Sequence, residues 1–213
     1  MNFISPELSQ YIDDHSEREP ELLKKLSRET WQKVVQPRML SGHVQGRFLS
    51  LISHLMAPKR ILEIGTYTGY SALCLCEGLA AGGELVTIDI NDELQWIQDK
   101  YFQASDHHGK IKRIFGNALE VLPSLDLAFD LVFIDADKEN YIRYYELLIE
   151  ALPPGACILV DNVLWSGKVM EPILPGDEET RVIGELNDLV TSDSRVHNVL
   201  LPLRDGVMMI RKK

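Results

Sequence analysis

The chain has 213 residues, of which 45% are hydrophobic and 25% charged, and its formal net charge at pH 7 is −10. This length suits one globular unit with a full hydrophobic core. The negative charge disfavours a nucleic-acid partner, which would need a local basic patch.

The N-terminal segment does not have the pattern of a secretory signal. Glu7, Asp13 and Asp14 occupy positions where a signal peptide would be basic and then apolar. No apolar run approaches the roughly 18 residues that a membrane span needs. The sequence therefore predicts a cytoplasmic protein with no membrane association.

The first 57 residues are predicted to form helices. Leu22, Leu23 and Leu26 recur at helical spacing, and a second apolar stripe runs over residues 44–55. Ser41 is a candidate N-cap for this second helix. We expect residues 1–57 to form an N-terminal helical segment, followed by a main unit over residues 58–213.

From residue 60 onward, short apolar runs alternate with amphipathic segments. The runs, which predict strands, cover residues 60–64, 85–90, 111–115, 131–134 and 156–160. The segments between them, which predict helices, cover residues 70–81, 92–104, 119–122 and 139–152. This alternation indicates an α/β fold of the Rossmann type, with a mostly parallel sheet and helices on both faces.

The C-terminal part has a different pattern. After a predicted helix over residues 178–190, two strand-like runs at 195–201 and 207–211 flank the turn residues of 204–206. This pattern predicts a terminal hairpin, which adds antiparallel strands to the sheet.

A glycine-containing turn follows the first predicted strand. In an open parallel sheet, ligands bind beyond the carboxyl ends of the strands. Gly65 and Gly69 let the backbone turn sharply and approach a ligand, although the pair alone is equally compatible with a plain β–α turn. Asp89, at the end of the second strand, can accept hydrogen bonds from both hydroxyls of a ribose, or serve as an ordinary strand-end residue. Together the two features indicate an adenosine-type ligand.

Small residues follow the third predicted strand. Gly116, Asn117 and Ala118 would let an adenine ring lie against the chain. A simple helix N-terminus explains them equally well.

Acidic and amide side chains follow the fourth and fifth strands. Asp135, Asp137 and Lys138 come after one strand, and Asp161 and Asn162 after the next. Carboxylate and amide oxygens suit hard cations, and crowded carboxylates are costly unless a cation neutralises them. A metal site is therefore favoured over ordinary strand-end capping.

Lys138 has two interpretations. Beside a metal ion, like-charge repulsion would favour its neutral amine, which could act as a general base. Alternatively, it forms a plain ion pair with Asp137. Trp165 could form a wall for an aromatic substrate or pack in the core. The loop over residues 165–177 is either a specificity loop or a connector.

Three motifs give the chain a family resemblance. They are EIGTYTGYS at residues 63–71, DLVFIDADKENY at residues 130–141 and DNVLW at residues 161–165, and the segment MLSGHVQG at residues 39–46 adds to them. With these motifs, the chain resembles the cation-dependent O-methyltransferases, the group that contains the caffeoyl-CoA and catechol O-methyltransferases.

The resemblance implies a seven-stranded methyltransferase domain at 58–213, S-adenosylmethionine as cofactor, a divalent cation (Mg²⁺, Ca²⁺ or Mn²⁺) and commonly a homodimer. The implied cofactor contacts are Ser41, Glu63, Gly65, Thr66, Ser71, Asp89, Ala118 and Asp137. The implied metal ligands are Asp135, Asp161 and Asn162, with Lys138 as the base and Asp135 beside it in the catalytic set. Trp165 and Ser166 are the expected substrate contacts.

The chain departs from the plant caffeoyl-CoA enzymes at one position that bears on the substrate. Those enzymes have Asn after the Trp and basic residues farther on, whereas this chain has Ser166 and then the acidic run 177–179. We therefore expect a small aromatic vicinal diol rather than a CoA thioester as substrate.

Two alternatives differ in function. The first is methylation of a hydroxylated uridine in tRNA, as some bacterial members of the family perform. The basic residues of the N-terminal helices would favour it, and the net charge disfavours it; they are Lys24, Lys25, Arg28, Lys33 and Arg38. The second is cofactor binding without catalysis, which the intact set of Asp135, Lys138, Asp161 and Asn162 argues against.

Overall fold

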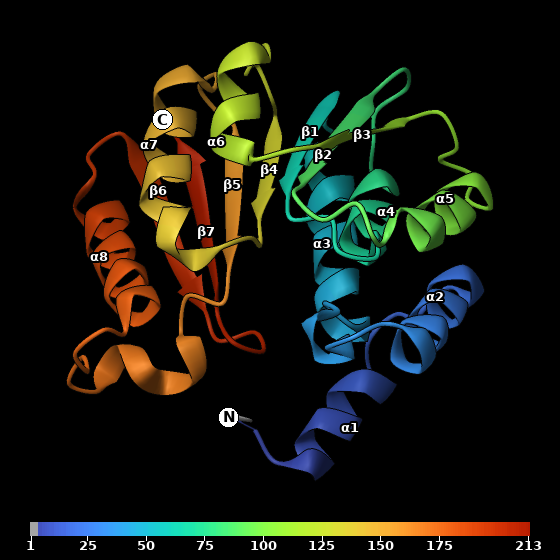
Figure 1. Ribbon diagram of the computed structural model, residues 1–213, viewed down its shortest axis with the longest axis horizontal. Helices are drawn as coiled ribbons and strands as arrows, with labels where there is room; N and C mark the ends of the chain where they lie inside the picture. Colours follow the sequence, from blue (N-terminus) through green and yellow to red (C-terminus); the bar gives the residue numbers. More distant parts are fainter. Residues whose placement is uncertain (1–3) are drawn as a thin grey trace. The chain divides into compact units, whose positions relative to one another are not determined.

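The computed structural model describes residues 4–213, and its contacts divide them into two compact units, residues 4–118 and 119–213. The strands follow the order β3-β2-β1-β4-β5-β7-β6 in a seven-stranded sheet (Figure 1). Their bounds are β1 Arg60–Ile64, β2 Glu84–Asp89, β3 Ile111–Phe115, β4 Leu131–Ile134, β5 Cys157–Asp161, β6 Val196–Leu201 and β7 Val207–Lys212. The predicted fold class is confirmed.

The unit of residues 4–118 contains the parallel strands β1, β2 and β3, with Ile61 beside Leu85 and Leu85 beside Ile111. Strand β1 is almost wholly buried, as expected for parallel strands that are covered on both faces. Its helices are α1 Pro6–Asp14, α2 Glu21–Lys33, η1 Pro37–Met39, α3 His43–Met56, α4 Tyr70–Cys76 and α5 Gln95–Gln103.

The predicted N-cap of α3 is wrong by one residue. Gly42, with φ 77°, precedes the helix, and no side chain caps its first turn. The chain enters α3 through a left-handed backbone conformation, which glycine adopts at little cost. Ser41 is buried one position earlier.

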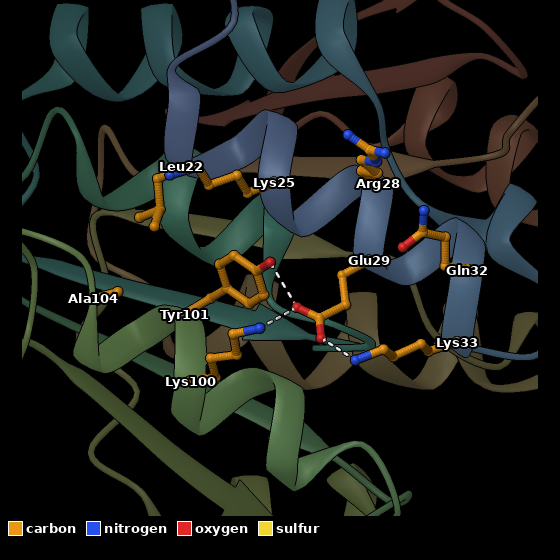
Figure 2. A pocket seen from close by; sticks show the side chains of 9 residues that line it. All are labelled: Leu22, Lys25, Arg28, Glu29, Gln32, Lys33, Lys100, Tyr101 and Ala104. Carbon is orange, nitrogen blue, oxygen red and sulfur yellow. Dashed lines mark hydrogen bonds and ion pairs between the residues drawn. The ribbon is translucent and has the colours of Figure 1, made fainter.

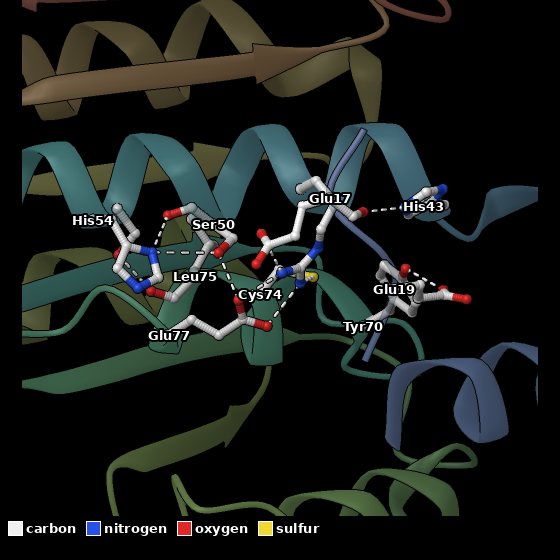
Figure 3. A network of polar contacts seen from close by, with 11 residues as sticks. Glu17, Glu19, His43, Ser50, His54, Tyr70, Cys74, Leu75 and Glu77 are labelled. Atoms are coloured by element: carbon white, nitrogen blue, oxygen red, sulfur yellow. Dashed lines mark hydrogen bonds and ion pairs between the residues drawn. The ribbon is translucent and has the colours of Figure 1, made fainter. Parts of the chain in front are cut away.

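A buried ion pair joins α3 to the end of α4. The Arg47 guanidinium donates to both carboxylate oxygens of Glu77, at 2.8 and 2.7 Å, and Ser50 Oγ donates to one of them at 2.6 Å (Figure 3). Burial raises the pKa of Glu77, but the hydrogen bonds from Arg47 and Ser50 outweigh it, so the net pKa lies below its ordinary value. The carboxylate is therefore charged at neutral pH.

The segment between α1 and α2 is fastened to the same helices. Tyr70 Oη donates to Glu19 Oε1 at 2.5 Å, and His43 Nε2 lies 2.6 Å from the carbonyl oxygen of Glu17 (Figure 3). These contacts join residues that are far apart in the sequence. They hold the N-terminal segment against α3 and α4.

In the unit of residues 119–213, β4 and β5 are parallel, and β7 and β6 are added antiparallel to them. The predicted terminal hairpin is therefore confirmed. Its helices are η2 Leu122–Ser124, η3 Lys138–Asn140, α7 Tyr141–Ala151, η4 Trp165–Met170 and α8 Glu178–Ser192, and the short α6 Ala118–Val121 precedes them. Helix α8 begins where Asp177 accepts a hydrogen bond from the Thr180 amide. Over residues 4–213, no helix is long and apolar enough to cross a membrane.

Replacing Glu77 with Gln should destabilise the fold, because the buried Arg47 charge would lose its closest ionic partner and keep the more distant Glu17, at 3.5 Å. We expect a loss of about 2–3 kcal/mol in the free energy of unfolding, measured by urea titration. Glu178→Gln is the matched control, because Glu178 pairs with Arg181 on the exposed face of α8. That variant should unfold like the wild type. Equal losses in the two variants would contradict the importance of the buried pair.

Candidate active site

The turn after β1 requires a glycine at its end. Gly69 has φ 88°, and a Cβ atom there would lie 2.4 Å from ring carbon Cε1 of Phe102 on α5. The Gly65 amide donates to the Ile88 carbonyl at 2.9 Å, so the turn starts from the β1–β2 ladder. The backbone of residues 65–69 is therefore fixed at both ends.

Asp89 holds this turn through its carboxylate. Its Oδ2 accepts hydrogen bonds from the backbone amides of Thr66 at 2.9 Å and Tyr67 at 2.8 Å. Its Oδ1 accepts one from the Asn91 amide at 2.9 Å. Because each carboxylate oxygen has two acceptor sites, Oδ1 keeps capacity for a further donor, such as a ribose hydroxyl.

A buried carboxylate lies beneath the turn. Glu63 is fully buried; its Oε1 accepts from Ser71 Oγ and its Oε2 from Thr87 Oγ1, each at 2.6 Å. Thr87 Oγ1 also lies 2.5 Å from Thr66 Oγ1. This hydroxyl network connects the end of β1, the end of β2 and the start of α4.

Ala118 follows a segment that is bonded to Asp89, and the segment before Ser41 is bonded to Tyr67 of the turn. Ala118 is buried at the start of α6, and the nearby Gly116 amide donates to the Asp89 carbonyl at 2.9 Å. Tyr67 Oη donates to the carbonyls of Val35 and Gln36, which precede Ser41 in the chain. The unit thus gathers Glu63, Gly65, Thr66, Ser71 and Asp89 into one network, with Ala118 next to it.

Three residues of this network were missed in the sequence: Tyr67, Thr87 and Gln98. The buried Gln98 on α5 donates from Nε2 to the Tyr67 carbonyl at 2.7 Å. A polar residue on the buried face of a predicted helix was the available signal for Gln98. Thr87 gave none, because threonine is common in strands.

The unit of residues 119–213 contains the second group of polar side chains. Ile134 of β4 pairs with Val160 of β5, so Asp135 and Asp161 are the next residues on neighbouring parallel strands. Asp161 is buried, and its Oδ1 accepts from the Asn162 amide at 2.8 Å. Asn162 has φ 63°, a left-handed conformation that Asn tolerates better than most residues. The expected metal ligands therefore lie at adjacent strand ends.

Lys138 pairs with Asp135, and the predicted pair with Asp137 is wrong. The buried Lys138 ammonium lies 3.0 Å from Asp135 Oδ1 and donates to Tyr141 Oη at 2.6 Å. Asp137 instead accepts from Tyr144 Oη at 2.7 Å and from the Asn140 side chain. The short helix η3 turns the two neighbouring side chains toward different partners.

Tyr141 is a further residue of this group that was missed in the sequence. Burial and the nearby Asp135 carboxylate raise the pKa of Tyr141 well above its ordinary value, so its phenol remains protonated. The phenol donates to the Asp161 carbonyl at 3.2 Å and accepts from Lys138. Its position three residues after Lys138, within the DADKENY segment, was the only signal in the sequence.

The donor chemistry here fits a hard cation. Among residues 4–213, no group of three or more His, Cys, Asp or Glu side chains is arranged to hold a metal ion. The expected set instead combines two carboxylates, of Asp135 and Asp161, with the amide of Asn162. Oxygen donors of this kind suit Mg²⁺, Ca²⁺ or Mn²⁺. The Lys138 ammonium provides positive charge beside Asp135.

The expected substrate residues begin helix η4, in the segment predicted to be a connector or specificity loop. Trp165, Ser166 and Gly167 have consecutive positive φ values of 46°, 54° and 84°. Within the described part of the chain, the buried Trp165 Nε1 has no hydrogen-bond partner. The Ser166 side chain is exposed, and its amide donates to Asp205 Oδ1. A buried indole N–H without a partner is uncommon and calls for an explanation.

Comparisons with known proteins agree with this arrangement. The profile of a family described as O-methyltransferase matches residues 13–213. Caffeoyl-CoA O-methyltransferase 2 of Zea mays is 36% identical over 224 residues, covering 98% of this chain and 83% of the relative.

Two solved structures share the fold over nearly the whole chain. The SAH-bound methyltransferase PaMTH1 of Podospora anserina has a TM-score of 0.88 and 28% identity, covering 100% of both chains. The O-methyltransferase of Bacillus cereus in complex with SAH has a TM-score of 0.88 and 28% identity, covering 97% of each chain. The expected resemblance and enzyme class are therefore confirmed, and the chain belongs to the O-methyltransferase family.

Proposed function

We propose that the protein transfers the methyl group of S-adenosylmethionine to one hydroxyl of a small aromatic vicinal diol, with the help of a divalent cation. The observation that carries this proposal is the pair of carboxylates at the ends of neighbouring strands, where Lys138 is hydrogen-bonded to Asp135. The two adjacent hydroxyl oxygens of a diol can both coordinate one cation, and a nearby amine can accept the hydroxyl proton. Methylation of a vicinal diol would use both functions.

The proposed cofactor site is the network around residues 63–71. Both solved relatives above are described as bound to SAH, which is the product that S-adenosylmethionine leaves after transfer. In the proposed contacts, the free acceptor capacity of Asp89 Oδ1 receives a ribose hydroxyl. Ala118 borders the adenine, while Ser41 and Asp137 contribute at the edges of the site.

Asp135, Asp161 and Asn162 would hold Mg²⁺, Mn²⁺ or Ca²⁺. When bound, the cation favours the ionised form of a phenol, whose pKa in solution is about 10. Lys138, as the neutral amine, would take the hydroxyl proton and become the ammonium, and Tyr141 keeps its nitrogen in place. The phenolate oxygen then bonds to the methyl carbon as the carbon–sulfur bond breaks, which releases SAH.

A free diol is preferred over a CoA ester as substrate. Asp177 caps α8 and pairs with Lys168, so this position offers a carboxylate where a CoA phosphate would need a cation. Trp165 and Ser166 are proposed to contact the aromatic ring and its substituents. The tRNA alternative has no observation in its favour at this site.

Three further proposals concern the whole molecule. A homodimer is supported by Leu51 and Leu55 on α3, whose exposed fractions are 58% and 74%. The bonds from Tyr67 to residues 35 and 36 support a role of the N-terminal segment in shaping the site. The cytoplasmic location stays a prediction from the sequence.

Removing divalent metal should abolish turnover. Treatment with EDTA is expected to stop methylation of a catechol, and added Mg²⁺ or Mn²⁺ should restore it, because the oxygen donors need a hard cation. The measurement is methyl transfer from labelled S-adenosylmethionine. SAH binding should survive EDTA, which controls for unfolding. Full activity after rigorous metal removal would rule out the metal.

Replacing Asp89 with Ala should weaken S-adenosylmethionine binding by at least about tenfold, since charge-assisted hydrogen bonds contribute roughly 1.5–3 kcal/mol each. Isothermal titration calorimetry measures the change. Asp92→Ala removes the same charge from an exposed position three residues later and should bind normally. Unchanged affinity in Asp89→Ala would remove this carboxylate from the proposed site.

Replacing Lys138 with Met should lower kcat by roughly 10²–10⁴-fold if the amine is the general base, less if the cation already ionises much of the phenol. Activity should return partly as the pH rises, because solvent then deprotonates the substrate. Cofactor affinity should stay near the wild-type value.

Lys168→Met is the matched control, because Lys168 is an exposed lysine of the same unit, paired with Asp177. It should keep wild-type kcat. If Lys138→Met instead showed wild-type kcat across about pH 6–9, the window that approaches the lysine and phenol ionisations, the proposed base would be wrong.

A further inference from the structure

A basic groove lies between α2 and α5, within the unit of residues 4–118. It is open to solvent and has a volume of about 420 Å³, which is within the range of sites for small organic ligands. Figure 2 shows the side chains that line it. Its charged and aromatic lining consists of Lys25, Arg28, Glu29, Lys33, Lys100 and Tyr101. The α2 residues recur at helical spacing, so one face of this helix forms a wall of the groove.

A single carboxylate lies among the cations. Glu29 Oε1 accepts from Lys33 at 2.8 Å, and its Oε2 accepts from Lys100 at 2.5 Å and Tyr101 at 2.8 Å (Figure 2). The hydrogen bonds from Lys100, Lys33 and Tyr101 lower the pKa of Glu29 to about 2. Glu29 is therefore ionised and fully used by these partners, and it neutralises one of the two lysines.

The other two cations of the groove, Arg28 and Lys25, do not pair with Glu29. Arg28 and Lys25 are exposed, and neither forms an ion pair with any residue from 4 to 213. Four cations against one carboxylate leave an excess of three positive charges in the lining, on a chain whose net charge is −10. Local charge of this sign attracts a compact anion.

Tyr101 lines the groove, and Trp96 lies outside the lining, beside Lys33. Lys33 Nζ lies 5.7 Å from the ring centroid of Trp96 on α5, and this indole remains 44% exposed. Lys100 Nζ lies 5.2 Å from the ring centroid of Tyr101. An exposed indole next to fixed cations offers a flat ring a stacking surface close to a site for phosphate.

We propose that this groove binds a nucleoside di- or triphosphate. Arg28 and Lys25 contact the phosphates, and Lys33 and Lys100 add positive charge beside Glu29. The base stacks on the exposed indole of Trp96, next to Lys33. The volume of the groove suits one such molecule, and the overall negative charge repels a long nucleic acid more than a small anion.

The test is calorimetric titration of ADP, inorganic triphosphate and adenosine into the full chain, with and without saturating SAH. ADP should bind saturably in both cases and weaken as salt is raised. Adenosine should not bind the SAH-saturated protein. Arg28→Gln should reduce ADP affinity about tenfold, as expected for a charge-assisted contact. Trp96→Ala should reduce affinity for ADP but not for triphosphate.

Lys24→Gln is the matched control. It removes the same charge from the same helix, but Lys24 does not line the groove and pairs with Glu21. Its ADP affinity should stay within about twofold of the wild type.

Four results would overturn the proposal. They are absence of ADP binding at about 1 mM, displacement of ADP by SAH, equal losses in the Arg28 and Lys24 variants, and tighter binding of a single-stranded oligonucleotide than of ADP. Displacement by SAH would assign ADP to the cofactor site. Preference for the oligonucleotide would assign the groove to RNA or DNA.

Discussion

The compensation of carboxylates near strand ends is the physical constraint on which the polar network of each unit depends. Within each unit, parallel strands bring their carboxyl ends to one edge, and the chain has an acidic residue at or directly after the end of β2, β4 and β5, with Glu63 one residue before the end of β1. Each must be hydrogen-bonded or paired, because burying an uncompensated charge is costly. In the unit of residues 4–118, backbone amides and hydroxyls compensate Asp89 and Glu63. In the unit of residues 119–213, Lys138 compensates Asp135.

The two modes of compensation have different consequences. Asp89 accepts from backbone amides of the turn after β1 and so fixes its conformation, while Glu63 accepts from hydroxyls of α4 and β2. Asp135 is held by a lysine ammonium, with which a metal cation would compete under the proposed function. The buried phenol of Tyr141 contacts both Lys138 and the Asp161 backbone, so it links the two strand ends.

Local patterns predicted the fold well, and long-range contacts account for what they missed. The strands at 60–64, 111–115 and 131–134 match exactly, because buried apolar runs define them. Helix α4 was expected to reach residue 81 but ends at Cys76. Just after this end, Gly78 packs against α3 so closely that a Cβ there would lie 2.1 Å from the Ser53 backbone. The motifs identified the acidic residues that follow or end β4 and β5, which are Asp135, Asp137 and Asp161. The partner of Lys138 depends on how the short helix η3 turns neighbouring side chains. The groove depends on how α2 packs beside α5, which no local pattern encodes.

The central claim is that the enzyme methylates a hydroxyl that has an adjacent hydroxyl. The most direct measurement compares methyl transfer to catechol and to resorcinol, isomers with hydroxyls on adjacent and non-adjacent carbons, at saturating S-adenosylmethionine and Mg²⁺. Only the adjacent pair can present two oxygens to one cation. The account predicts that kcat/KM for catechol exceeds that for resorcinol by at least about 100-fold, or roughly 3 kcal/mol of transition-state stabilisation. Equal values for the two isomers would contradict it.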